Sequence, residues 1–200
     1  MTVPKFFLAV DFETTGLLPE IHEPMELAVV LLDAQLDEVW RRHYFLRSNG
    51  VEDKSLPLSL IGRQCDPVVL EMHIKSGLLL EYVSNKRTSY GDAASALCGD
   101  LRTASANPRD IVLFGNTVRF DASFMNVFMP DVLKCVHYRH LDVTAVRYGM
   151  IPVTGIDFEM PKKKEHRASY DVDESIAEFR FLWREFFAWC QKDGRPRIRI

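Results

Sequence analysis

The sequence has 200 residues, of which 47% are hydrophobic and 26% are charged. This is the composition of one globular domain with enough apolar side chains for a full core. The formal net charge of −3 excludes an overall basic field, although a local basic patch can suffice for nucleic-acid binding. The four cysteines form no CxxC pair, which argues against a zinc site and a disulfide framework and favours reduced thiols.

The first residues, MTVPKFFLAVDFE, contain an apolar run that acidic residues cut short. They lack the long apolar core and the cleavage site of a signal peptide. No apolar run in the sequence reaches the length that spans a membrane. We therefore expect a cytoplasmic protein with no membrane partner.

The predicted elements begin with three strands that form a meander. Apolar and β-branched runs place these strands at 5–10, 26–33 and 39–47. Residues 48–66 contain two glycines and a proline and predict a long loop. A helix is then predicted within 67–84, broken near Ser76 and Gly77, and an amphipathic helix follows at 91–105.

Strands and helices alternate in the rest of the chain, which predicts an α/β fold with a mixed sheet. We expect a buried strand at 110–116, helices at 120–129, around 144–149 and at 169–191, and a loop at 150–164. The last helix carries an apolar stripe at helical spacing, which predicts a core face rather than a binding surface. The stripe comprises Ile176, Phe179, Leu182, Trp183, Phe186 and Phe187. We expect a single domain over 1–191 and a solvated basic tail over 192–200.

Two carboxylates follow the first strand in the segment VDFETTGL, namely Asp11 and Glu13. On a strand, a spacing of two residues puts both side chains on the same face, a few ångströms apart. Like charges at that distance repel each other and raise each other's pKa. Such a pair at the end of an apolar strand therefore needs a physical reason.

Two further segments carry isolated charged groups at the starts of predicted helices. Asp121 lies in GNTVRFDASF, and His166 and Asp171 lie five residues apart in KKKEHRASYDVDES. Each acid alone is equally well explained by the helix dipole, which favours acids in the first turn. Together, the four carboxylates suit two Mg²⁺ or Mn²⁺ ions, which prefer oxygen ligands and can clamp a phosphodiester. Histidine is the residue type most often used as a general base near neutral pH, which makes His166 the candidate base.

This set of residues, in this order, resembles the DEDDh 3′–5′ exonucleases of the ribonuclease H-like fold. The resemblance implies a mixed central sheet, with an antiparallel meander of strands 1–3, parallel later strands and helices on both faces. It implies that His166 is the base, as the histidine five residues before the last acid. It also implies four metal ligands, namely Asp11, Glu13, Asp121 and Asp171.

Several segments are similar to oligoribonucleases in particular. HYRHLDVTA (137–145) resembles their HYRYLDVST, MHIKSGL (72–78) their H-x-KSGL element and GNTVRFD (115–121) their GNSIGQD. KKKEHRASYDVDESIAEF resembles their KKGTHQALDDIRESIAEL. The likeness covers most of the chain except roughly 47–66, 150–161 and the tail. It implies hydrolysis of short single-stranded RNA to 5′-mononucleotides with two Mg²⁺ or Mn²⁺ ions, by a homodimer.

The resemblance also implies roles in substrate binding. Leu17 would wedge against the terminal bases, and His73 would contact the substrate. Thr117, Arg139 and Thr144 would bind the 5′ phosphate, with Tyr138 and Arg139 supplied by the neighbouring protomer. Without the resemblance, Tyr138 and Arg139 would be interpreted as a surface strand pair. Lys162–Lys164 suit a phosphate-attracting loop or a merely solvated run equally well.

The sequence departs from the oligoribonuclease pattern at three places. Val68, Val69 and Leu70 stand where an aromatic residue usually stacks on a base, and His140 stands where tyrosine is usual. The region 48–66 is expanded. These departures keep a 3′–5′ exonuclease on longer single-stranded DNA or RNA as the alternative. A non-catalytic binding module and a purely structural domain are less favoured, because the base and all four metal ligands are intact.

Overall fold

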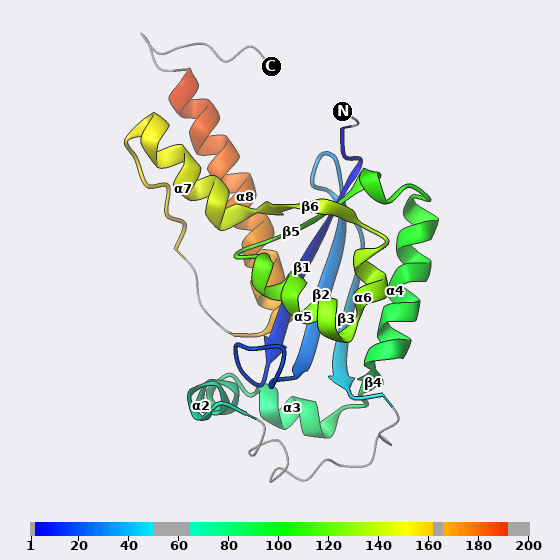
Figure 1. The fold of residues 1–200 in the computed structure, drawn as a ribbon. Coiled ribbons are helices and arrows are strands. Elements are labelled where there is room, and N and C mark those ends of the chain that lie inside the picture. Colours follow the sequence, from blue (N-terminus) through cyan, green and yellow to red (C-terminus); the bar gives the residue numbers. More distant parts are fainter. Residues whose placement is uncertain (1–2, 50–64, 162–165, 192–200) are drawn as a thin grey trace.

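The computed structural model describes residues 3–49, 65–161 and 166–191 of the chain. These residues fold around a mixed six-stranded sheet (Figure 1). The strands lie in the order β4-β3-β2-β1-β5-β6. Strands β1, β2 and β3 are antiparallel neighbours, whereas β5 is parallel to β1 and β6 is parallel to β5. The expected meander and the expected later parallel strands are therefore confirmed. The strands are β1 Phe6–Thr14, β2 Pro24–Asp33, β3 Glu38–Arg47, β4 Thr88–Ser89, β5 Ile111–Gly115 and β6 His137–Asp142.

Helices cover both faces of the sheet, as predicted. Side chains alternate between the faces of β1, so Leu8 and Val10 pack toward α4 and α5, whereas Ala9 packs toward α8. None of the helices in the described part of the chain combines the length and apolarity needed to cross a bilayer. The helices are α2 Pro67–Lys75, α3 Leu78–Ser84, α4 Tyr90–Ala104, the 3₁₀ turn η1 Pro108–Asp110, α5 Arg119–Phe128, α6 Pro130–Leu133, α7 Val143–Thr154 and α8 Ala168–Cys190.

Two helices end beside a glycine that adopts a left-handed backbone conformation. The predicted break near Ser76 is confirmed, because Gly77 adopts a left-handed conformation with φ of 76° between α2 and α3. The predicted loop at 150–164 begins later than expected, because α7 continues through Pro152 and ends at Thr154, before the left-handed Gly155, whose φ is 69°. Pro152 has no N–H to donate to the carbonyl four residues earlier, so the last turn of α7 forms without that backbone bond.

The apolar stripe of α8 is core only in part. Phe179 and Leu182 are buried against the sheet. Trp183 and Phe187 are 39% and 40% exposed, so the prediction that the whole stripe faces the core is wrong for these two residues. They line an open apolar groove of about 730 Å³ between α8, the start of β1 and the β2–β3 turn, where no closed core covers them. Residues 50–64 of the predicted loop, Lys162–Lys164 and the predicted tail 192–200 lie outside the described residues, and the single-domain assignment stays a prediction.

Candidate active site

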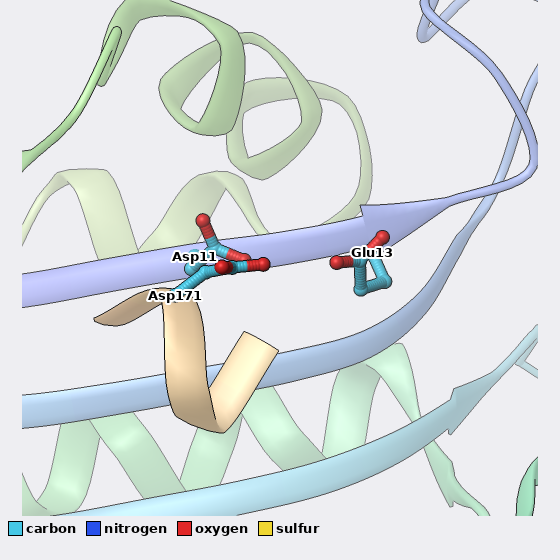
Figure 2. Close-up of side chains that lie close together, drawn as sticks. All are labelled: Asp11, Glu13 and Asp171. Carbon is cyan, nitrogen blue, oxygen red and sulfur yellow. The ribbon is translucent and has the colours of Figure 1, made fainter. Parts of the chain in front are cut away.

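Three carboxylates from β1 and α8 meet at one point. Asp11 and Glu13 project from the same face of β1 as Ala9, toward the N-terminal end of α8. Asp171 lies in the first turn of α8. Ligand oxygens of these three residues lie within 4.8 Å of one another. Figure 2 shows the Asp171 side chain beside that of Asp11, with Glu13 further along β1.

Asp121 adds a fourth carboxylate from α5. Its side chain is 3% exposed, and its Oδ1 accepts the backbone N–H of Phe12 over 2.9 Å. Phe12 stands between Asp11 and Glu13, so this bond ties Asp121 to the acidic end of β1. The negative charge of Asp121 also raises the pKa of Asp11, in addition to the effect of burial. The four acids predicted from three separate segments thus lie at the same end of the sheet.

The protonation of the site reflects this crowding. Burial, followed by the charges of Asp171 and Glu26, raises the pKa of Glu13 to about 8. Burial raises the pKa of Asp121 to about 8 as well, although the Phe12 N–H opposes the shift. A group of carboxylates that resists ionisation in this way is a site that a divalent cation would stabilise, and an all-oxygen ligand set suits a hard cation. The residues present therefore fit the metal that the sequence predicts.

His166 lies at the entry to α8, directly before Arg167 and the first helical residue Ala168. Its backbone is left-handed, with φ of 52°. Burial lowers the pKa of His73 in α2, and electrostatic repulsion by His166 contributes to the same shift. The Arg167 N–H donates to Asp171 Oδ2 over 3.1 Å, so the segment that carries His166 is bonded directly to a predicted metal ligand.

The two residues predicted to contact the bases occupy very different positions. Leu17 is 70% exposed in the loop after β1. His73 is fully buried in α2, where its Nε2 bonds the Thr14 carbonyl over 2.7 Å and its Nδ1 lies 3.8 Å from Glu13 Oε2. In this position His73 supports the acidic end of β1, and its predicted substrate contact stays a prediction.

The structure brings together two of the residues predicted to bind the 5′ phosphate. The hydroxyls of Thr117 and Thr144 lie 3.5 Å apart. Thr144 Oγ1 donates to Asn116 Oδ1 over 3.1 Å, and Asn116 Nδ2 donates to Glu178 Oε2 over 2.9 Å. Asn116 therefore connects the two threonines to α8, which also carries Asp171.

Tyr138 and Arg139 lie on β6 at the edge of the sheet. Tyr138 is 75% exposed and stacks on His137, and the Arg139 guanidinium lies 5.3 Å from the Tyr138 ring centroid. The Arg139 N–H donates to His137 Nδ1 over 2.9 Å. Both side chains are thus presented outward, and the predicted protomer exchange and homodimer stay predictions.

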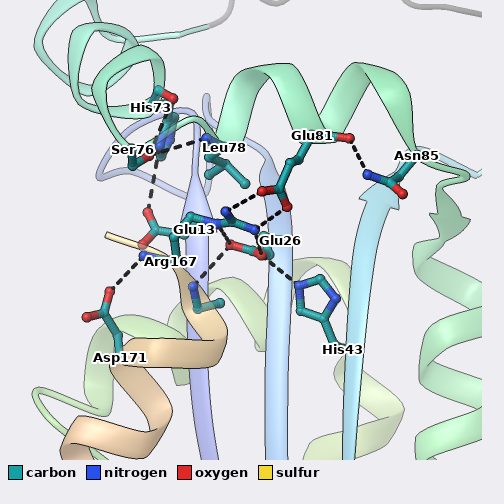
Figure 3. A network of polar contacts seen from close by, with 11 residues as sticks. Glu13, Glu26, His43, His73, Ser76, Leu78, Glu81, Asn85, Arg167 and Asp171 are labelled. Carbon is teal, nitrogen blue, oxygen red and sulfur yellow. Dashed lines mark hydrogen bonds and ion pairs between the residues drawn. The ribbon is translucent and has the colours of Figure 1, made fainter. Parts of the chain in front are cut away.

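Several residues near the site were not identified from the sequence. Glu26 faces Glu13 across the β1–β2 register and is fully buried. It bonds His43 and Arg167, and Figure 3 shows this network beside Glu13 and Asp171. One signal was available for Glu26, because it is the only charged residue in the apolar run MELAVVLL. A charge in a buried strand requires a partner.

Comparisons with known proteins relate the whole chain to curated oligoribonucleases. Those of Tropheryma whipplei (strain Twist) and Thiobacillus denitrificans are 35% and 32% identical over 189 and 192 residues. Each alignment covers 92% of this chain, and they cover 94% and 96% of the two relatives. No protein-family model matches the chain.

Solved structures of E. coli exonuclease I share the fold. The complex with a dT13 oligonucleotide has a TM-score of 0.60 at 15% identity, covering 93% of this chain. The apo form has a TM-score of 0.61 at 17% identity. This chain spans 43% and 45% of those two chains, which is less than half of exonuclease I. The likeness confirms the expected ribonuclease H-like architecture.

Proposed function

Because the chain belongs to the oligoribonuclease family, we propose that it is a metal-dependent 3′–5′ exonuclease that cleaves short single-stranded RNA to 5′-mononucleotides. The observation that carries the proposal is the meeting of Asp11, Glu13 and Asp171, with Asp121 bonded to the same strand. His166 at the entry to α8 completes the set. A purely structural domain would bear the repulsion of these acids without compensation.

Each proposed catalytic residue has a chemical role. Asp11, Glu13, Asp121 and Asp171 would hold two Mg²⁺ or Mn²⁺ ions, which would supply Lewis-acid polarisation of the phosphodiester and activation of the attacking water. His166 accepts the proton that this water loses. The water oxygen bonds to phosphorus, and the bond from phosphorus to O3′ of the preceding nucleotide breaks. The leaving O3′ takes a proton from solvent, and a 5′-mononucleotide is released.

The proposed substrate residues lie at both ends of a short RNA. Leu17, exposed beyond β1, wedges against the terminal bases, and the buried His73 supports the acidic end of β1 beside them through Thr14 and Glu13. Thr117 and Thr144 bind the 5′ phosphate through their paired hydroxyls. Arg139 contacts the same phosphate with a guanidinium fork, and it comes with Tyr138 from the second protomer of a homodimer.

A length series tests this function. The protein is incubated in Mn²⁺ or Mg²⁺ with 5′-labelled RNA of two, five and twenty nucleotides and with the matching DNA. Asp11→Asn and His166→Ala are assayed beside it, and Arg184→Ala, on α8 with a side chain that is 71% exposed, serves as the surface control. The proposal is supported if the wild-type protein consumes the RNA dinucleotide fastest of all substrates and if Asp11→Asn and His166→Ala do not consume it. No cleavage of any substrate by the wild-type protein refutes it.

One observation favours a second candidate, a 3′–5′ exonuclease on longer single strands. Val68 lies on α2 with 77% of its side chain exposed, at a position where oligoribonucleases usually carry a stacking aromatic. Base stacking on an aromatic side chain is worth about 1–3 kcal/mol per base. If the twenty-nucleotide strands shorten from the 3′ end while the dinucleotide persists, this second candidate replaces the first.

A further inference from the structure

The guanidinium of Arg167 lies between two carboxylates from different elements, as Figure 3 shows. Its Nε and Nη2 donate to Glu26 on β2 over 3.4 and 3.2 Å. Its Nη1 and Nη2 donate to Glu81 on α3 over 2.9 and 2.6 Å. The Arg167 side chain is 11% exposed and that of Glu26 is fully buried. Such a double fork fixes the orientation of the guanidinium as well as its position.

Glu26 also holds the first residue of α8. Its Oε2 accepts the Ala168 N–H over 3.0 Å, and its Oε1 bonds His43 Nε2 over 2.6 Å. Burial alone would raise the pKa of Glu26, but the hydrogen bonds from His43, Arg167 and Ala168 lower it overall. The first N–H groups of a helix have no partner within the helix, and a carboxylate is a favourable acceptor for them. Glu26 therefore anchors the start of α8 to the strand beside Glu13.

These contacts surround the backbone of one residue that has strained geometry. His166 directly precedes Arg167, and its φ of 52° is unusual for a residue with a side chain. Such conformations persist only when the surrounding structure enforces them. On the C-terminal side, Arg167 is fixed by its side chain and by its N–H bond to Asp171, and Ala168 is fixed by Glu26.

We propose that Arg167 and Glu26 are positioning residues that hold His166 in the orientation needed for proton transfer. The inference rests on the proposed function, because it concerns the base of that reaction. Neither residue is assigned contact with the substrate or the metal. Their effect is exerted through the backbone of 166–168, and a misplacement of about 1 Å can cost about 100-fold in rate.

The competing explanation is that the ion pairs serve only to stabilise the fold. Breaking a buried pair is strongly destabilising in either case, so a loss of stability alone does not distinguish the explanations. A positioning role predicts a fall in kcat with little change in KM. It also predicts that lysine, which cannot fork to two carboxylates, rescues the enzyme only in part.

The test compares Arg167→Met and Arg167→Lys with Arg41→Met. Arg41 also joins α8, pairing with Asp173 and Glu38 at 3.2 and 2.6 Å, but it lies on the exposed face of β3. Steady-state kinetics on the RNA dinucleotide are measured in saturating Mn²⁺, with thermal melting in EDTA and in Mn²⁺ as the check on folding. We expect kcat to fall about 100-fold in Arg167→Met and about tenfold in Arg167→Lys, with KM within about threefold. Arg41→Met should match the wild type, and all variants should keep the Mn²⁺-dependent gain in melting temperature.

The outcomes separate the inference from the function. A wild-type protein that cleaves RNA, with an Arg167→Met variant of equal kcat, overturns the positioning role and leaves the function intact. A wild-type protein that cleaves nothing refutes both. If Arg167→Met does not fold, Arg167→Lys and Glu26→Gln carry the test. Unchanged kcat in both of these variants overturns the inference, and reduced kcat with unchanged KM supports it.

Discussion

Phe12 donates its backbone N–H to the Asp121 carboxylate, although the two residues are 109 positions apart in the sequence. The bond lies in the interior and uses the one backbone donor that stands between Asp11 and Glu13. Asp121 is therefore a structural acceptor for β1 as well as a proposed metal ligand. These two roles respond differently to substitution.

Asp121→Asn should separate the two roles. The amide oxygen still accepts the Phe12 N–H, so the metal-free melting temperature should be preserved or increased, because a buried acid with a raised pKa is removed. Activity should fall by more than about 100-fold. Even the substitution of residues that only hydrogen-bond to metal ligands lowers metal affinity or activity by about 10–100-fold. Asp121→Ala leaves the N–H without its acceptor and should also lose about 1–3 kcal/mol of stability. Equal melting temperatures for the two variants would contradict this assignment.

The metal-free protein should lose stability as the pH rises. In the folded protein the pKa values of Glu13 and Asp121 are about 8, against ordinary values of 4.5 and 3.8. Between these limits the folded state binds more protons than the unfolded state, so the free energy of unfolding decreases with pH. Melting in EDTA from about pH 5 to about pH 8 should show a falling melting temperature.

Metal should reverse this trend. Ligands bind Mn²⁺ in their ionised form, so metal affinity, and with it the melting temperature, should rise with pH. At about 100-fold excess of Mn²⁺ over its Kd, the gain is about 2.7 kcal/mol. Glu13→Gln is the control, and it should make the fall in EDTA shallower, because one of the two acids with a pKa of about 8 is removed and Asp121 remains. A flat EDTA profile in the wild type would show that the acids ionise normally.

Leu17→Ala should weaken substrate binding without affecting the fold. The side chain is 70% exposed, so the stability change should stay within about 0.5 kcal/mol. KM for the RNA dinucleotide should rise about tenfold or more, because burying a leucine is worth about 1.5–3 kcal/mol. Leu80→Ala, on α3 with 71% exposure, is the matched control and should leave KM unchanged. An unchanged KM in Leu17→Ala removes this residue from the proposed wedge.

Mixing two inactive variants tests whether Arg139 acts across a homodimer. Arg139→Ala lacks the phosphate contact and Asp11→Asn lacks a metal ligand. A mixed dimer contains one site with Asp11 from one protomer and Arg139 from the other, which is a complete site. Equal mixing should restore about a quarter of the wild-type activity after subunit exchange. No recovery, in a mixture that light scattering shows to be dimeric, would place Arg139 in the site of its own protomer.

The sequence predicted those parts of the site that depend on short-range geometry. A spacing of two residues on a strand was enough to place Asp11 and Glu13 together, and the first turns of two helices were enough to locate Asp121 and Asp171. The break at Gly77 followed from the conformational freedom of glycine. The order of the acids then supplied the resemblance, which the comparisons bear out.

The remaining features depend on contacts between distant segments. Nothing in the run MELAVVLL says that Glu26 meets Arg167, because 141 residues separate them. The helical spacing of Trp183 and Phe187 predicts a shared face but not whether the sheet extends far enough to cover it. Periodicity reports which side of a helix is apolar, and only the fold determines what lies against that side.

The position of α8 has a consequence for the synthesis of the protein. This helix supplies Asp171, follows His166 directly and covers the Ala9 face of β1. A ribosome adds about 5–20 residues per second, so the acidic pair on β1 exists for many seconds before its partners are made. During that interval the nascent chain lacks the proposed ligand Asp171, and the apolar face of β1 that α8 covers is exposed. A chain that ends before α8 therefore lacks the proposed metal ligand Asp171 and at the same time leaves that apolar face uncovered.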